Sequence, residues 1–164
     1  MKAKDPVQIL FVCLGNICRS PLAEGIFLYH ADLRSLQDMF EVDSCGTGDW
    51  HIGEKPDRRV RQIARKHGVY LPSIARQLDA DSDFQRFDFF LAMDRANRAD
   101  LLKLGAKPER VHLMRSFDPA SSNLPEEDLD VPDPYYGGDE GFEQVYTMLV
   151  AACKGLIDTL VASE

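Results

Sequence analysis

The stretch that most constrains the fold runs from an apolar segment through a short loop into a helix signal. Residues 9–12 are apolar and partly β-branched, which predicts a buried strand. Ser20-Pro21 is the pairing expected where a helix begins, a side-chain cap followed by proline at the first helical position. The loop between them holds Cys13 and Arg19. Because a helix N-terminus and loop N–H groups converge there, we expect an anion site whose field favours a Cys13 thiolate.

Strand and helix patterns alternate along the rest of the chain, which indicates an α/β fold with a parallel sheet. The length of 164 residues fits one domain over 1–164. We expect three layers, α/β/α, around a central four-stranded parallel sheet, with the anion-binding loop between the first strand and the first helix. The predicted later strands are 40–45, 87–93 and 111–114, and the predicted helices are 21–33, 57–67, 95–104 and 142–160.

The carboxyl ends of parallel strands face one edge of a sheet, where ligands bind at a topological switch point. The loops after the first, second and fourth strands should therefore converge. These loops are 13–20, the glycine-punctuated 46–50, and the acidic, proline-punctuated 116–141. A connection as long as the last of these is usually functional or disordered.

Composition limits the classes of partner. The net charge of −8 argues against a general nucleic-acid binder, although a local site can still bind an anion. No uninterrupted apolar run approaches the roughly 20 residues of a membrane span, and the start lacks a signal-peptide core, so we expect a cytoplasmic protein without a membrane partner. The four cysteines fit neither a disulfide scaffold nor a zinc site, so we expect no metal, no cofactor and a monomer.

Cys13 and Arg19 enclose five residues, a C-x5-R pattern. Backbone donors of a curled loop and a planar guanidinium suit a tetrahedral oxyanion. The nucleotide-binding pattern G-x4-G-K-[ST] is absent. The alternative is that Cys13 is a buried inert thiol and Arg19 a surface ion pair.

Longer motifs resemble those of one family. Val12 to Pro21, V-C-L-G-N-I-C-R-S-P, is similar to the signature of the low-molecular-weight protein tyrosine phosphatases. Asp133 to Tyr136, D-P-Y-Y, resembles the acid loop of that family. Between them, residues 44–47, 75–77 and 92–94 resemble its S-A-G-T, A-R-Q and A/C-M-D segments. The resemblance covers nearly the whole chain in order.

The resemblance implies a two-step phosphoryl transfer without metal. Cys13 is then the nucleophile that forms a cysteinyl-phosphate, Arg19 holds the phosphate, and Asp133 is the general acid and then the general base. Composition alone does not distinguish Asp133 from the other carboxylates of its segment, which are Asp118, Asp128 and Asp130.

The resemblance also predicts which residues surround the phosphate and the leaving group. The loop residues expected to bind substrate are Leu14, Gly15, Asn16, Ile17, Cys18 and Ser20. Among them the Asn16 side chain should brace the loop, with Ser44 as a further brace, and Ser20 should cap the helix and contact Cys13. Aromatic walls for a phenyl ring are expected from Trp50, Tyr135 and Tyr136. The alternatives are a turn-forming Asn16, a neutral Ser44 and core aromatics.

Cys18 is expected to be a resolving thiol that forms a reversible disulfide with Cys13 and so protects it from over-oxidation; the alternative is a small space-filling residue. Cys45 and Cys153 are expected to be buried and inert. Relatives often have a histidine at the position of Ser73, so a network behind the loop is predicted to differ here.

Together these residues predict hydrolysis of phosphotyrosine, in a protein or a small aryl phosphate, with phosphate or a similar oxyanion in the site. An arsenate reductase is an alternative, but the chain has no cysteine pair on a flexible segment downstream. A non-catalytic phosphate-binding module would require that the nucleophile or the acid were lost, and both are present.

Overall fold

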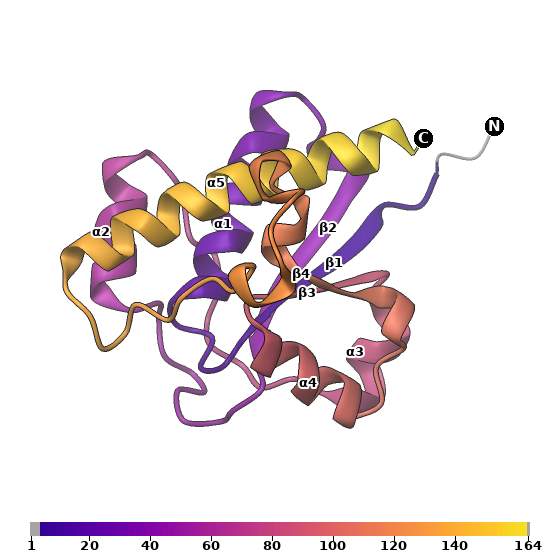
Figure 1. The fold of residues 1–164 in the computed structure, drawn as a ribbon, viewed down its shortest axis with the longest axis horizontal. Helices are drawn as coiled ribbons and strands as arrows, with labels where there is room; N and C mark the ends of the chain where they lie inside the picture. Colours follow the sequence, from indigo (N-terminus) through magenta and orange to yellow (C-terminus); the bar gives the residue numbers. More distant parts are fainter. Residues whose placement is uncertain (1–3, 164) are drawn as a thin grey trace.

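A four-stranded, all-parallel sheet forms the centre of the molecule, as predicted (Figure 1). The computed structural model describes residues 4–163, so residues 1–3 and 164 of the predicted domain lie outside it. The strands lie in the order β2-β1-β3-β4. Their bounds are Val7–Cys13 for β1, Phe40–Gly46 for β2, Phe89–Ala92 for β3 and Val111–Leu113 for β4.

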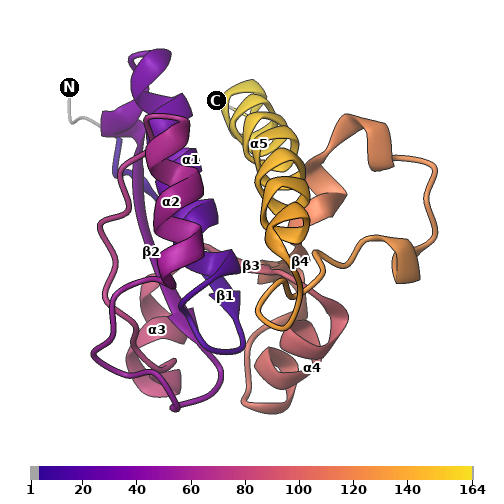
Figure 2. The same ribbon diagram turned by 90° about the vertical axis from the view of Figure 1, so that its left-hand side faces the viewer.

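Helices cover both faces of this sheet. Figure 2 shows α1, α2 and α5 on one face and α3 and α4 on the other. Their bounds are Arg19–Leu33 for α1, Arg58–Lys66 for α2, Ala80–Arg86 for α3, Arg95–Lys103 for α4 and Asp139–Ala162 for α5. Successive side chains of a strand point to opposite faces. In β1, Ile9 and Phe11 therefore join one apolar cluster while Leu10 and Val12 join the other.

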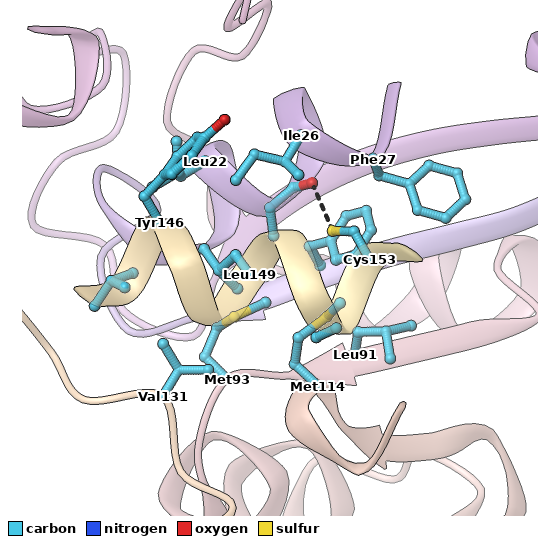
Figure 3. Packing of buried hydrophobic residues seen from close by; sticks show 14 of the residues in the cluster. Leu22, Ile26, Phe27, Leu91, Met93, Met114, Val131, Tyr146, Leu149 and Cys153 are labelled. Atoms are coloured by element: carbon cyan, nitrogen blue, oxygen red, sulfur yellow. Dashed lines mark hydrogen bonds between the residues drawn. The ribbon is translucent and has the colours of Figure 1, made fainter. Parts of the chain in front are cut away.

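The long helix α5 fills the larger cluster (Figure 3). Its Leu149 and Cys153 are fully buried against Leu22 and Ile26 of α1, and the Cys153 thiol donates to the carbonyl of Ala23 at 3.6 Å. Among the described residues, α5 has the length and apolar composition of a membrane span, although the sequence offers no uninterrupted apolar run. Half of its apolar stretch is buried within the protein, so core packing accounts for that composition.

Most helix ends lie where the sequence predicts them. Asp57 and Asp94 cap α2 and α4, accepting hydrogen bonds from the backbone N–H groups of Arg59 and Asn97. Gly68 and Gly105, which follow these two helices, adopt positive φ angles of 72° and 111°. Glycine adopts this conformation without steric cost, which is why it ends helices.

Two local predictions are wrong. The first helix begins at Arg19 after Cys18, so Ser20 and Pro21 lie inside its first turn, and Ser20 is not the cap. Its hydroxyl turns to Cys13 instead, because the loop places the sulfur within hydrogen-bonding distance. The helix α3 was not predicted, because seven residues carry too little periodic apolar signal; the Asp79 carboxylate caps it. The strand β3 consequently begins at Phe89 rather than at residue 87.

The loops at the carboxyl edge of the sheet converge as expected. The N–H groups of Thr47 and Gly48 donate to the carbonyls of Cys13 and Leu14, each at 2.9 Å, and this ties the loop after β2 to the loop after β1. The acidic segment joins the same edge through the N–H of Val131, which donates to the Met93 carbonyl at 2.8 Å.

Candidate active site

The loop after β1 curls around the sulfur of Cys13. This residue is 2 % exposed and ends the central strand β1. The backbone N–H of Asn16 donates to its Sγ at 3.3 Å, and the Ser20 hydroxyl lies 3.0 Å from the same atom. Both donors suit a thiolate, which accepts hydrogen bonds but cannot donate them. The loop thus surrounds the sulfur with donors.

Asn16 holds the loop in this shape. Its backbone is left-handed, with φ 57°, a conformation that asparagine tolerates better than most residues. Its side-chain amide donates to the hydroxyls of Ser20 at 2.8 Å and Ser44 at 3.0 Å, and its carbonyl oxygen accepts from the Arg76 N–H at 3.0 Å. These three bonds offset the cost of the backbone conformation and connect the loop to two neighbouring segments.

The network ends at a buried carboxyl group, Glu24 of α1. The Ser44 hydroxyl donates to Glu24 Oε1 at 2.6 Å, and Glu24 is only 4 % exposed. Burial raises the pKa of this carboxyl to about 7, although the hydrogen bond from Ser44 works in the opposite direction. Ser73, the residue found in place of the histidine of relatives, is buried, and its hydroxyl has no hydrogen-bond partner within the described structure.

Arg19 lies at the start of α1 with its guanidinium almost fully buried. Its Nη1 donates to Asp94 Oδ2 at 2.6 Å and to the Val131 carbonyl at 3.0 Å. Burial opposes its charge, but the Cys13 sulfur and the adjacent carboxylates raise its pKa above the usual value. The side chain is therefore a fixed cation with planar donors, the arrangement that binds phosphate oxygens in pairs.

Asp133 faces the guanidinium from the acidic segment. Its Oδ2 lies 3.6 Å from Arg19 Nη2, and its Oδ1 accepts from the Tyr135 N–H at 3.0 Å. The other carboxylates of the segment have different surroundings. Asp130 pairs with Arg95, and Asp118 caps a short 3-10 turn. Only Asp133 of the described carboxylates in 116–141 lines the cavity above Cys13.

This cavity has a volume of about 330 Å³. Its walls include the predicted Trp50, Tyr135 and Tyr136, and Trp50 and Tyr136 are 69 % and 91 % exposed, which excludes them from the core. The loop contributes Leu14, Gly15, Ile17 and Cys18, whereas the side chains of Asn16, Ser20 and Ser44 lie behind the loop. A carboxylate, a guanidinium and a sulfur thus line one cavity that also has aromatic walls.

Cys18 shares the cavity with Cys13, and both are reduced. Burial and the neighbouring Asp57 raise the Cys18 pKa far above its ordinary value, so this thiol stays protonated beside the charged groups of the site. Cys45 and Cys153 are completely buried outside the cavity, and burial raises the pKa of each thiol. In residues 4–163, no three His, Cys, Asp or Glu side chains come together as metal ligands.

Sequence reasoning missed three residues around the site. Asp94 directly precedes the predicted helix 95–104 and caps it through Oδ1, but its other oxygen, Oδ2, binds Arg19. Glu24 lay unremarked in a helix, and His51 lines the cavity and pairs with Glu54. The A-M-D motif carried a signal for Asp94, since it follows a strand that ends at the same edge. No local pattern marks Glu24, whose partner Ser44 lies on β2, or His51, whose place in the cavity depends on segments that are distant in the chain.

Comparison with known proteins places the chain in a family. Residues 8–164 match the family described as Low molecular weight phosphotyrosine protein phosphatase. The chain is 42 % identical to the Low molecular weight phosphotyrosine protein phosphatase of Schizosaccharomyces pombe, over 94 % of this chain and 97 % of the relative.

Solved structures agree over similar lengths. The structure of YfkJ from Bacillus subtilis covers 99 % of both chains with a TM-score of 0.89 and 33 % identity. A protein tyrosine phosphatase from Entamoeba histolytica, with Hepes in the active site, covers 96 % of this chain and 98 % of its own, with a TM-score of 0.87 and 36 % identity. This chain therefore belongs to the low molecular weight phosphotyrosine protein phosphatase family and is a phosphoric monoester hydrolase.

Proposed function

We propose that this phosphatase hydrolyses phosphotyrosine through a covalent intermediate on Cys13. In the first step the Cys13 thiolate attacks phosphorus, an S–P bond forms and the P–O bond to the phenol breaks. In the second step water attacks the same phosphorus, and the S–P bond breaks to release phosphate and the thiolate. The observation that carries this proposal is the convergence of Cys13, Arg19 and Asp133 in one cavity.

Arg19 and the loop N–H groups are proposed to hold the phosphoryl oxygens in both steps. Charge spreads over three equatorial oxygens in the transition state of phosphoryl transfer. Donors that are already oriented stabilise this charge without reorganisation. Arg19 is oriented by Asp94 and the Val131 carbonyl, so its donors are held in place before the substrate arrives.

Asp133 is proposed to protonate the departing phenolate oxygen and then to accept a proton from the attacking water. Its position at the cavity wall supports this, since the leaving group of a phosphate seated over Cys13 points away from the sulfur. Its Oδ2 lies 3.6 Å from Arg19 Nη2, so the proposed acid stands beside the guanidinium that is proposed to hold the phosphate.

The aromatic rim supports an aryl ester as substrate, in a phosphotyrosine protein or a small aryl phosphate. A phenyl ring would extend from the phosphate between Trp50 and Tyr135. Hepes, which the Entamoeba relative holds in its active site, carries a sulfonate, another tetrahedral oxyanion. Its presence there supports phosphate or a similar oxyanion as the group bound by this loop.

Replacing Asp133 by Ala tests the assignment of the acid. We expect kcat to fall by ~10²–10⁴-fold for substrates whose leaving group needs a proton, and to fall less for aryl phosphates with acidic phenols. Steady-state kinetics on a series of aryl phosphates measures this dependence. Phosphotyrosine and phosphoserine peptides extend the series to the two biological leaving groups, a phenol and an alcohol. Phosphotyrosine should be turned over well above phosphoserine.

Asp130→Ala is the matched control. It removes a carboxylate from the same segment that pairs with Arg95 away from the cavity. Equal losses in the two variants, or a loss in Asp133→Ala that is the same for every leaving group, would contradict the assignment.

We further propose that Cys18 acts as the redox partner of Cys13. Both thiols line one cavity, so oxidised Cys13 sulfenic acid has a thiol at hand to form a disulfide with loss of water. The raised pKa of Cys18 keeps it from competing as nucleophile before oxidation. Peptide mapping after mild peroxide should find a Cys13–Cys18 link, and Cys18→Ser should instead accumulate sulfinic acid at Cys13. Sulfinic acid at Cys13 in the unaltered protein would contradict the proposal.

A further inference from the structure

A second groove opens beside the active-site cavity. It has a volume of about 450 Å³ and shares Ile17, His51 and Tyr135 with the cavity, so the two lie side by side. Its other wall is formed by the segment that leads into α2 and by the first turns of that helix. Figure 1 shows α2 next to the gold loop that enters α5, and the Arg59 guanidinium donates to the Tyr135 carbonyl across this junction at 2.8 Å.

The groove is basic, although the protein has a net charge of −8. Three exposed cations line it: Lys55, Arg58 and Arg61. Of these, Arg61 donates to the backbone carbonyl of Pro56 at 2.9 Å. The side chains of Lys55 and Arg58 have no hydrogen bond or ion pair to any residue between 4 and 163.

Neither of the two acidic residues of the groove forms an ion pair with these three cations within residues 4–163. The Glu54 carboxylate pairs with the His51 ring. The Asp57 carboxylate caps α2 and accepts from the Arg59 side chain at 3.2 Å. Both carboxylates hold hydrogen bonds to other side chains, and the three cations outnumber them in the groove.

We propose that this groove binds acidic side chains that flank the phosphotyrosine of a protein substrate. The inference rests on the proposed function, because a phosphate held over Cys13 fixes where the rest of the substrate begins. An extended chain advances about 3.3–3.6 Å per residue, so carboxylates one to three residues from the phosphotyrosine reach the mouth of the cavity. Exposed cations at such a site contribute to selectivity and association rate more than to affinity.

Matched peptides test the expected preference for acidic residues beside the phosphotyrosine. Two phosphotyrosine peptides carry Asp and Glu on the N-terminal or the C-terminal side of the phosphotyrosine, and their counterparts carry Asn and Gln. We expect at least one acidic peptide to show a kcat/KM about 3–10-fold above its neutral counterpart at low salt, with the ratio falling towards one at high ionic strength. Arg58→Glu and Lys55→Glu should each abolish or reverse the preference.

Arg65→Glu is the matched control variant. Arg65 is exposed on the same helix and does not line the groove, so the change in net charge is identical. The preference should survive in this variant. Equal kcat/KM for acidic and neutral peptides in the unaltered protein, or an equal loss in Arg65→Glu, would overturn the proposal.

Turnover of para-nitrophenyl phosphate separates this inference from the proposed function. This substrate has no flanking residues, so the groove variants should hydrolyse it at the unaltered rate. If the unaltered protein hydrolyses para-nitrophenyl phosphate but does not discriminate between acidic and neutral peptides, the proposed groove function is wrong and the proposed catalytic function stands. An unaltered protein that hydrolyses neither this substrate nor the peptides contradicts the proposed function itself.

Discussion

Behind the loop after β1, polar side chains form a continuous hydrogen-bond network from α1 to the sulfur of Cys13. The Glu24 carboxyl accepts from Ser44, Ser44 accepts from Asn16, and the Asn16 amide also reaches Ser20 beside Cys13. Each group is buried, so each would cost free energy if its partner were removed. This network therefore fixes the position of the Ser20 hydroxyl that contacts the sulfur, although Cys13 is the only one of these residues that lines the cavity.

The raised pKa of Glu24 predicts a pH-dependent stability. Between its ordinary pKa of 4.5 and its folded value of about 7, the native state keeps a proton that the unfolded chain has lost. The free energy of unfolding should therefore fall as pH rises through this window, by about 2–3 kcal/mol between pH 5 and pH 8 from Glu24 alone. Urea unfolding at both pH values measures it.

Glu24→Gln is the comparison for this measurement, because the amide oxygen still accepts from Ser44 but carries no charge. Its stability relative to the unaltered protein should rise with pH by the same 2–3 kcal/mol. A constant difference between the two proteins from pH 5 to pH 8 would show that Glu24 does not hold a proton in the folded state.

The sequence motifs predicted the side chains that line the cavity better than they predicted the residues that support them. Cys13, Arg19 and Asp133 belong to short motifs, and the structure gathers them in one cavity. Glu24 could not be predicted because a glutamate within a helix normally faces solvent, and its partner Ser44 lies on another element. Ser20 was mistaken for a cap because the pairing Ser-Pro has the same local appearance whether or not a sulfur lies nearby.

The end of β2 is the element that most restricts where the backbone of the loop after β1 can lie. Gly46 pairs with Cys13 in the parallel register of β1 and β2, and its Cα packs against the loop backbone. A Cβ built on Gly46 would lie 2.7 Å from the Leu14 carbonyl oxygen and 3.2 Å from the Asn16 nitrogen. Because both contacts are backbone atoms, no side chain can move aside to make room.

Gly46→Ala should therefore displace the loop and lower aryl phosphate turnover by roughly 10-fold or more, since misplaced donors lose transition-state stabilisation. Steady-state kinetics and inorganic phosphate binding together measure the effect. Gly138→Ala is the control, since a Cβ there meets no atom within 4 Å and its φ is not left-handed. Full activity in Gly46→Ala would mean that the loop tolerates the shift.

Most strands and helices were predicted well because the signals that mark their ends are local. Apolar runs, glycine stops and the Asp57 and Asp94 caps lie within a few residues of the ends that they mark. The short helix α3 has no apolar face of this kind and was not predicted. The predicted third strand therefore began two residues too early, at residue 87 instead of Phe89. The size of the cavity and the basic groove beside it depend on distant segments, so neither could be predicted.

For the molecule as a whole, the parallel sheet explains how the proposed nucleophile, Cys13, and the proposed acid, Asp133, meet although they are 120 positions apart in the chain. Cys13 ends the central strand, and the acidic segment returns to the same edge through the bond between Val131 and Met93. The buried face of α5 fixes this arrangement from behind by packing on α1. The fold thus brings together groups that no local motif connects.

Phosphoryl transfer in this protein is proposed to pass through Cys13 without a metal ion. The most direct measurement is aryl phosphate turnover by Cys13→Ser with a chelator present, beside inorganic phosphate binding to the same variant. We expect a loss of at least roughly 10⁴-fold in turnover with phosphate binding retained, because Arg19 and the loop N–H groups remain. Turnover in Cys13→Ser close to that of the unaltered protein, or activity of the unaltered protein that disappears with the chelator and returns with added metal, would contradict it.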